Sequence, residues 1–110
     1  MNDLEQVEIQ IEMATRIRKL RDNTAKLMND KLWKDVIDEG YFKEEAARLV
    51  MAKSSLMNAE QKQVIDNMIY GVGALKNWLE SVMRRGAEMD QAIGEHETTR
   101  EELLREEVSK

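Results

Sequence analysis

The sequence predicts an all-α protein, an elongated bundle of about four to five helices with one long coiled-coil-like amphipathic helix. Proline is absent from the 110 residues, so no backbone N–H is missing from a helix interior. Apolar residues recur at intervals of three and four, and no useful length of chain alternates with period two. Apolar residues make up 42% and charged residues 35%, which suits helices with one face in water.

The first helix is expected from about residue 3 to residue 28. Leu4, Val7, Ile11 and Ala14 form one stripe, and a second set follows it, consisting of Ile17, Leu20, Thr24 and Leu27. Two successive steps of three join the sets, so the stripe should rotate around the helix. Asn2 or Asp3 can cap the start, because short polar side chains accept hydrogen bonds from free helical N–H groups.

Several short helices are expected in the middle of the chain. Asn29-Asp30 is the first break, because both side chains compete for backbone hydrogen bonds. A short helix or turn should follow and end at Gly40, acting as the glycine after a helix end. A further helix is expected over 41–53, ended by Ser54-Ser55.

The long helix is the best-specified element, running from about Asn58 to beyond Ile93. Asn58 and Gln61 form a capping box at its start. Apolar residues then step by three and four over four heptads, a pattern typical of helix association, with only Gly86 lacking a side chain. We call these residues the seam: Ile65, Met68, Val72, Leu75, Leu79, Val82, Gly86, Met89 and Ile93.

The length of this helix raises a question about association. A straight helix over 58–94 would be roughly 55 Å long, whereas a compact globule of this size has a radius of gyration of about 13 Å. We therefore expect either a break, at Gly71, Gly86 or Gly94, or a partner for the seam. A capping box at Thr98 or Thr99 could begin a last short helix. The expected organisation is a single domain over 1–110, divided at about 57/58 and 95/96.

Composition excludes several classes of protein. The chain has no cysteine, which removes disulfides, thiol catalysis and cysteine-containing metal sites. It has neither an apolar run of about 18 residues nor a secretory signal pattern. We expect no transmembrane segment and a location in the cytoplasm or within a virion or other assembly.

Charge is separated along the chain, whose net charge is −5. Residues 14–34 contain seven basic residues against two acidic ones, a net charge of +5, and residues 87–110 contain eight acidic against three basic, a net charge of −5. Pairing between these segments, an acidic protein partner and nucleic acid are all open. The candidate basic face consists of Arg16, Arg18, Lys19, Arg21 and Lys26.

No motif predicts catalysis, a metal or a cofactor, so we expect a protein that is not an enzyme. His96 is the only histidine, too few for a histidine-based metal site, and no local motif gives it a nucleophile. Gly71-Val72-Gly73 is no phosphate loop, because the seam passes through Val72 and no Gly-Lys-Ser/Thr follows. Close helix packing or a break at Gly71 are the alternatives for these glycines.

Function is expected to lie in surfaces. The leading hypothesis is a non-enzymatic protein–protein interaction module, a self-associating or assembly subunit whose seam binds a partner, including a second copy. The alternatives are a small acidic inhibitor or adaptor, of the kind that phages and mobile elements encode, and a nucleic-acid-associated accessory protein that uses the basic first helix. The aromatic residues are candidate anchors, because tryptophan and tyrosine dominate binding hot spots: Trp33, Tyr41, Phe42 and Trp78.

Overall fold

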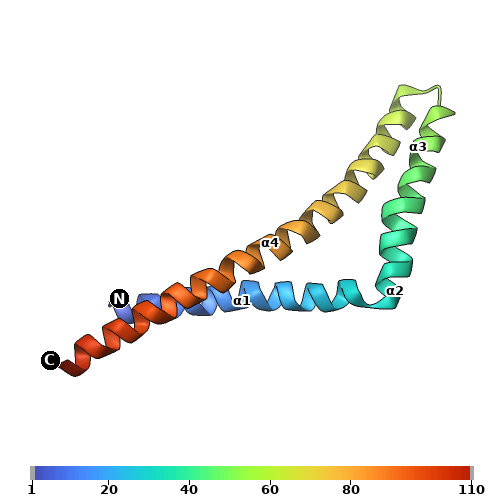
Figure 1. The fold of residues 1–110 in the computed structure, drawn as a ribbon. Helices are drawn as coiled ribbons and strands as arrows, with labels where there is room; N and C mark the ends of the chain where they lie inside the picture. Colours follow the sequence, from blue (N-terminus) through green and yellow to red (C-terminus); the bar gives the residue numbers. More distant parts are fainter. Residues whose placement is uncertain (1, 110) are drawn as a thin grey trace. The chain divides into compact units, whose positions relative to one another are not determined.

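The protein is all-α, as a computed structural model that describes residues 2–109 shows. The elements are α1 (Asp3–Asn29), α2 (Lys31–Trp33), the π-helical stretch η1 (Lys34–Glu45), α3 (Ala46–Ser54) and α4 (Ala59–Ser109). Because α2, η1 and α3 follow one another without a gap, the described residues form three continuous helical segments (Figure 1). None of the described helices is long and apolar enough to cross a membrane.

The helix boundaries that depend on local capping are as expected. The side chain of Asn2 accepts a hydrogen bond from the Glu5 N–H at 2.8 Å. Asp30 separates α1 from α2. Its carboxylate accepts a hydrogen bond from the Leu32 N–H at 2.8 Å and so caps the start of α2. Asn58 accepts from the Glu60 N–H at 2.7 Å and begins α4.

The expected count of four to five helices is wrong, because two expected helix ends do not occur. Gly40 lies within η1 and has no left-handed φ, so it does not end a helix. The hydroxyls of Thr98 and Thr99 bond to carbonyls four residues back at 3.1 Å and do not cap a new helix. Both segments continue the helices that were expected to end.

The expected break in the long helix is also absent. α4 runs for 51 residues through Gly71, Gly86 and Gly94. Nothing lies within 4 Å of a Cβ built on Gly71 or Gly94, whereas Gly86 is buried and closely approached. A mid-helix glycine costs only about 1 kcal/mol relative to alanine, which is too little to end a helix that is packed elsewhere.

The chain divides into two compact units that cut across α1 and α4. Unit 1 contains the chain up to Thr24 and from Val82 onward, and unit 2 is Ala25–Ser81. In unit 1 the first part of α1 and the last part of α4 lie side by side and run in opposite directions (Figure 1). In unit 2 the short loop before Asn58 joins α3 to the start of α4, which returns beside it (Figure 1).

Candidate interaction surfaces

The seam is the buried face of α4. Every residue of this helix that is fully buried belongs to it: Val72, Leu79, Val82, Gly86 and Ile93. The other seam residues Ile65, Leu75 and Met89 are half-buried, and Met68 is 50% exposed. The chain's own packing thus buries much of the face that the sequence pointed to. Binding of a partner by the seam stays a prediction.

The packing face of α1 follows a different path from the expected one. Val7, Ala14 and Thr24 are buried, but Leu20 and Leu27 are 43% and 51% exposed. The expected rotation of the stripe is therefore wrong for these two leucines. Continuing the steps of three and four from Ala14 leads instead to Arg18 and Arg21, which are half-buried.

Arg21 takes a packing position because Gly86 leaves room for it. A Cβ built on Gly86 would lie 2.2 Å from Cγ and 2.3 Å from Cβ of Arg21, closer than atoms can approach. The aliphatic stem of the arginine therefore lies directly against the α4 backbone. Gly86 was one of the positions considered for a helix break, whereas in the structure it lies within unbroken α4 and allows this close approach.

The Arg21 guanidinium ends in a two-pronged contact with α4. Its Nη1 and Nη2 donate to the two carboxylate oxygens of Asp90 at 2.9 and 3.0 Å, and its Nε donates to Asp22 at 2.7 Å. These hydrogen bonds hold the pKa of Asp90 below its usual range and raise the pKa of Arg21. Planar, two-pronged pairing is geometrically more specific than a point-charge contact, so it favours the observed register of α1 and α4 in unit 1.

The expected basic face is partly neutralised. Arg16 bonds to Glu12 at 2.8 Å, Arg21 bonds to two aspartates, and Arg18 lies 4.0 Å from Asp90. Lys19 and Lys26 are exposed. Within unit 1 the basic and acidic segments do meet, at the contact between Arg21 and Asp90.

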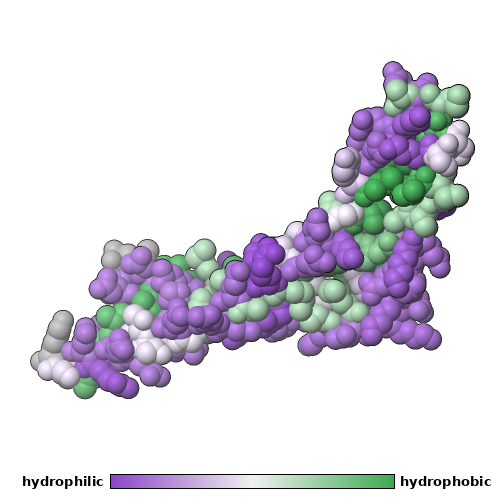
Figure 2. Space-filling view, turned by 45° about the horizontal axis from the view of Figure 1, so that its top comes forward, coloured by the Kyte–Doolittle hydropathy of each residue, from purple (hydrophilic) through white to green (hydrophobic). Residues whose placement is uncertain are grey.

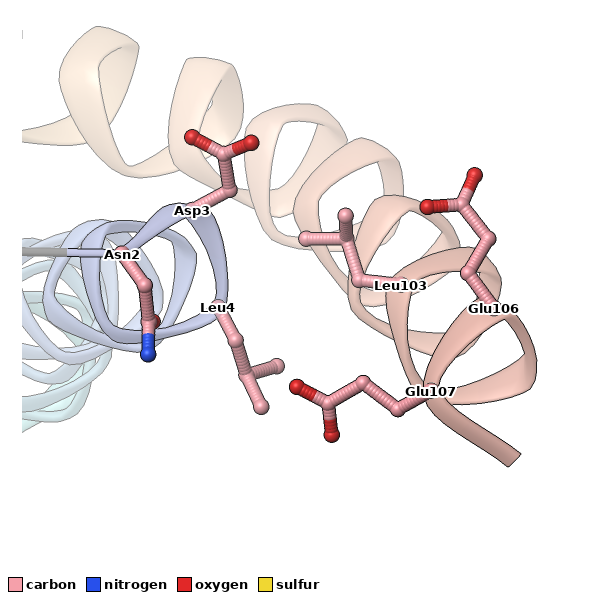
Figure 3. Close-up of a pocket in the computed structure, with 6 residues that line it drawn as sticks. All are labelled: Asn2, Asp3, Leu4, Leu103, Glu106 and Glu107. Carbon is pink, nitrogen blue, oxygen red and sulfur yellow. The ribbon is translucent and has the colours of Figure 1, made fainter. Parts of the chain in front are cut away.

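One shallow cavity of about 210 Å³ lies at the end of unit 1. Leu4 from α1 and Leu103 from α4 line it, and the Glu107 carboxylate extends toward the Leu4 side chain (Figure 3). Asn2, Asp3 and Glu106 complete its lining. In the described part of the chain, no group of three or more histidine, aspartate or glutamate side chains is placed to hold a metal.

Unit 2 has a small apolar interior and a large apolar exterior. Leu49, Val72 and Leu79 are its buried apolar residues, and Lys53 pairs with Asp66 at 2.7 Å. Figure 2 shows apolar side chains gathered at the surface of this unit. Its exposed large apolar residues are Leu27, Leu32, Val36, Val50, Met51, Met57, Val64, Met68, Tyr70 and Trp78.

The expected aromatic anchors are placed unequally. Trp78 is 47% exposed, whereas Trp33, Tyr41 and Phe42 are half-buried. The Trp33 indole N–H is buried without a hydrogen-bond partner, and the rings of Tyr41 and Phe42 lie 5.9 Å apart at 45°. Val36, Ile37, Gly40, Tyr41 and Glu45 line a shallow hollow on this stretch. Of the four anchors, Trp78 is the one that offers a large exposed face.

Sequence reasoning missed one surface on α1. Ile9, Met13 and Leu20 are 42%, 59% and 43% exposed and lie on a different side of the helix from buried Val7 and Ala14. Their spacing of four and seven could have identified a second apolar stripe.

Comparison with family models, with curated proteins and with solved structures finds no match to this chain.

Proposed function

We propose that this protein is a non-enzymatic helical module that acts through protein–protein contacts and associates with itself, either as a homo-oligomer or as a subunit of an assembly. One observation carries the proposal. Among the described residues, fifteen large apolar side chains are exposed and seven apolar residues are buried. Scattered exposed apolar residues are ordinary, but contiguous groups of them mark binding surfaces.

The exposed large apolar residues are unevenly distributed between the two units. Ten of the fifteen belong to unit 2, and three of the five in unit 1 form the stripe on α1. Burying one such side chain in an interface contributes roughly 1.5–3 kcal/mol. Because Val72, Leu79, Val82 and Ile93 of the seam are already buried, the proposal places association on the exposed residues.

The non-enzymatic part of the proposal rests on chemistry. Catalysis usually needs a nucleophile, a base and an electrostatic stabiliser held together in a pocket. The sequence supplies no cysteine and one histidine, and the hollows described above are shallow and lined by apolar or acidic groups. The carboxylates at these hollows belong to helix surfaces, where such groups commonly serve solubility.

Light scattering and sedimentation equilibrium across micromolar concentrations test the proposal. We expect a mass that rises with concentration above that of the 12.8 kDa chain. Trp78→Ser and Met57→Ser in unit 2 serve as surface variants, and the exposed polar position Asn77 provides the matched control Asn77→Ser. A mass that stays at one chain throughout the range would overturn self-association.

A second candidate is a small acidic inhibitor or adaptor that docks on another macromolecule. The exposure of Tyr70 (73%) and Trp78 (47%) on α4 favours it, because these residue types anchor interfaces. This candidate predicts a stable monomer that binds a partner through unit 2. Its test is capture of that partner by the wild-type chain and loss of capture with Trp78→Ser.

A further inference from the structure

The stripe on α1 is an apolar face that the chain leaves open. Ile9, Met13 and Leu20 are each more than 40% exposed, although they lie on the helix whose other face carries buried Val7 and Ala14. Residues four and seven apart share one side of a helix. The same helix therefore presents two apolar faces, of which unit 1 covers one.

A row of charged residues borders this stripe at intervals of seven. Glu5, Glu12, Lys19 and Lys26 follow one another along α1, all exposed. Seven residues rotate an α-helix by only about 20° from two full turns, so the four side chains lie along one edge of the stripe. Their order along the helix is acid, acid, base, base. When a second copy of the row runs in the opposite direction, each acid therefore faces a base.

We propose that the stripe of α1 binds α1 of a second copy in antiparallel orientation about a two-fold axis; the inference rests on the proposed self-association. In the register that places Ile9 against Leu20 of the second copy, Glu12 lies beside Lys19 and Glu5 beside Lys26. Each pair occurs twice, because a two-fold contact is reciprocal. Four opposite-charge pairs then flank the apolar contact, and Met13 packs near its centre.

A parallel arrangement gains none of these pairs. In a parallel pair, the edge residues face positions five residues further along the other helix. For Glu5, Glu12 and Lys19 these positions are Gln10, Ile17 and Thr24, which carry no charge. For Lys26 the position is Lys31, which lies beyond α1 and has the same charge as Lys26. The charge order therefore selects a second copy in the antiparallel sense.

Glu12 is already bonded to Arg16 within its own helix, at 2.8 Å. The two side chains are 64% and 76% exposed, and exposed pairs of this spacing contribute little. Glu12 can therefore exchange Arg16 for Lys19 of a second copy at small cost. Arg16 itself faces Met13 in the proposed register, where its aliphatic stem can cover the thioether.

Charge reversal with rescue tests this surface. Glu12→Lys places like charges at two of the four pairs. It should raise the dissociation constant of the dimer about tenfold at low salt. The double variant Glu12→Lys with Lys19→Glu restores both pairs and should return it to within about threefold of wild type. Lys19→Glu alone is a second variant of the same kind, and circular dichroism checks the helix content of each.

Glu88→Lys is the matched control, because it makes the same charge change on an exposed position of unit 1 that lies on α4 and outside the stripe. Sedimentation equilibrium at about 50 mM salt measures the dissociation constant of wild type, the two single variants, the double variant and the control. A wild-type chain that stays monomeric overturns the proposed function and this inference together. If Glu12→Lys associates as strongly as Glu88→Lys, the α1 surface alone is overturned. If the double variant does not recover wild-type association, the antiparallel register is overturned.

Discussion

The two units of this protein hold their helices together by different means. Unit 1 places an arginine among its packing positions, against a glycine and across from an aspartate. Unit 2 buries only apolar side chains, around Leu49 and Leu79, and has its ion pair of Lys53 and Asp66 half-exposed. Replacing an ion pair at a packing position by apolar residues is often neutral or stabilising, so we expect the Arg21–Asp90 pair to contribute to the register of unit 1 more than to its stability.

The units also differ in what they leave exposed. Unit 2 exposes ten large apolar side chains and unit 1 exposes five, although their lengths are similar. Burial of exposed apolar groups is favourable, so under the proposed function unit 2 offers the larger surface for association. We therefore expect unit 1 to fix the register of its helices and to offer the α1 stripe for association, and unit 2 to offer the larger apolar surface. The following variants test this division.

The largest loss of stability is expected from Leu49→Ala, which leaves a cavity among the buried apolar residues of unit 2. Leu49 is only 2% exposed, and truncating a buried leucine costs about 2–5 kcal/mol. Denaturant unfolding measures the loss, and hydrogen exchange locates it. We expect faster exchange of amides in 31–81 than in 82–109.

Met51→Ala is the control for this truncation, because Met51 is 70% exposed on the same helix. It should change the free energy of unfolding by less than about 0.5 kcal/mol. Equal acceleration of exchange in both units by Leu49→Ala would show that they unfold as one and would remove the division.

Gly86→Ala should be the next largest, and it acts on unit 1. Alanine gains about 1 kcal/mol in helix propensity, but overpacking against the Arg21 stem costs about 1–3 kcal/mol. We expect a net loss of up to about 2 kcal/mol in the free energy of unfolding, with faster exchange near residues 14–24. Gly94→Ala has open space around its Cβ and should stabilise by up to about 1 kcal/mol. If both variants stabilise alike, close approach at Gly86 is wrong.

Asp90→Asn should give a smaller effect that depends on pH. The pKa of Asp90 is lowered in the folded chain, because Arg21 donates to its carboxylate. A lowered pKa contributes stability that is present above the ordinary aspartate value of about 3.9 and is lost as pH falls through the folded value. Wild type should lose more stability than Asp90→Asn between pH 6 and pH 2.5 in thermal unfolding. Parallel loss in the two proteins would count against the contact.

The smallest effect is expected from Lys53→Met in unit 2. Its partner Asp66 and Lys53 itself are 32% and 41% exposed, and such single-point pairs contribute about 0.2–1 kcal/mol. Unfolding at low and high salt should show the small difference only at low salt. A larger effect than that of Asp90→Asn at neutral pH would reverse the comparison between the units.

The features that could be predicted from the sequence depend on neighbouring residues. Asn2, Asp30 and Asn58 cap helices through hydrogen bonds to N–H groups two or three residues away, so their effect is visible locally. The inward face of α4 was also predictable, because the period of apolar residues records which side is buried. The open stripe of α1 was missed, although its spacing was equally visible, since apolar residues on two faces give no single direction.

What the sequence by itself determined is an all-α chain, its main helix starts and the buried face of its longest helix. Only the tertiary structure decided that Gly86 is a packing site and Arg21 a packing residue. A glycine in a helical sequence is compatible either with a helix end or with close approach of another helix. The choice at Gly86 depends on Arg21, which lies 65 positions earlier in the chain and meets it only once α1 and α4 pack in unit 1.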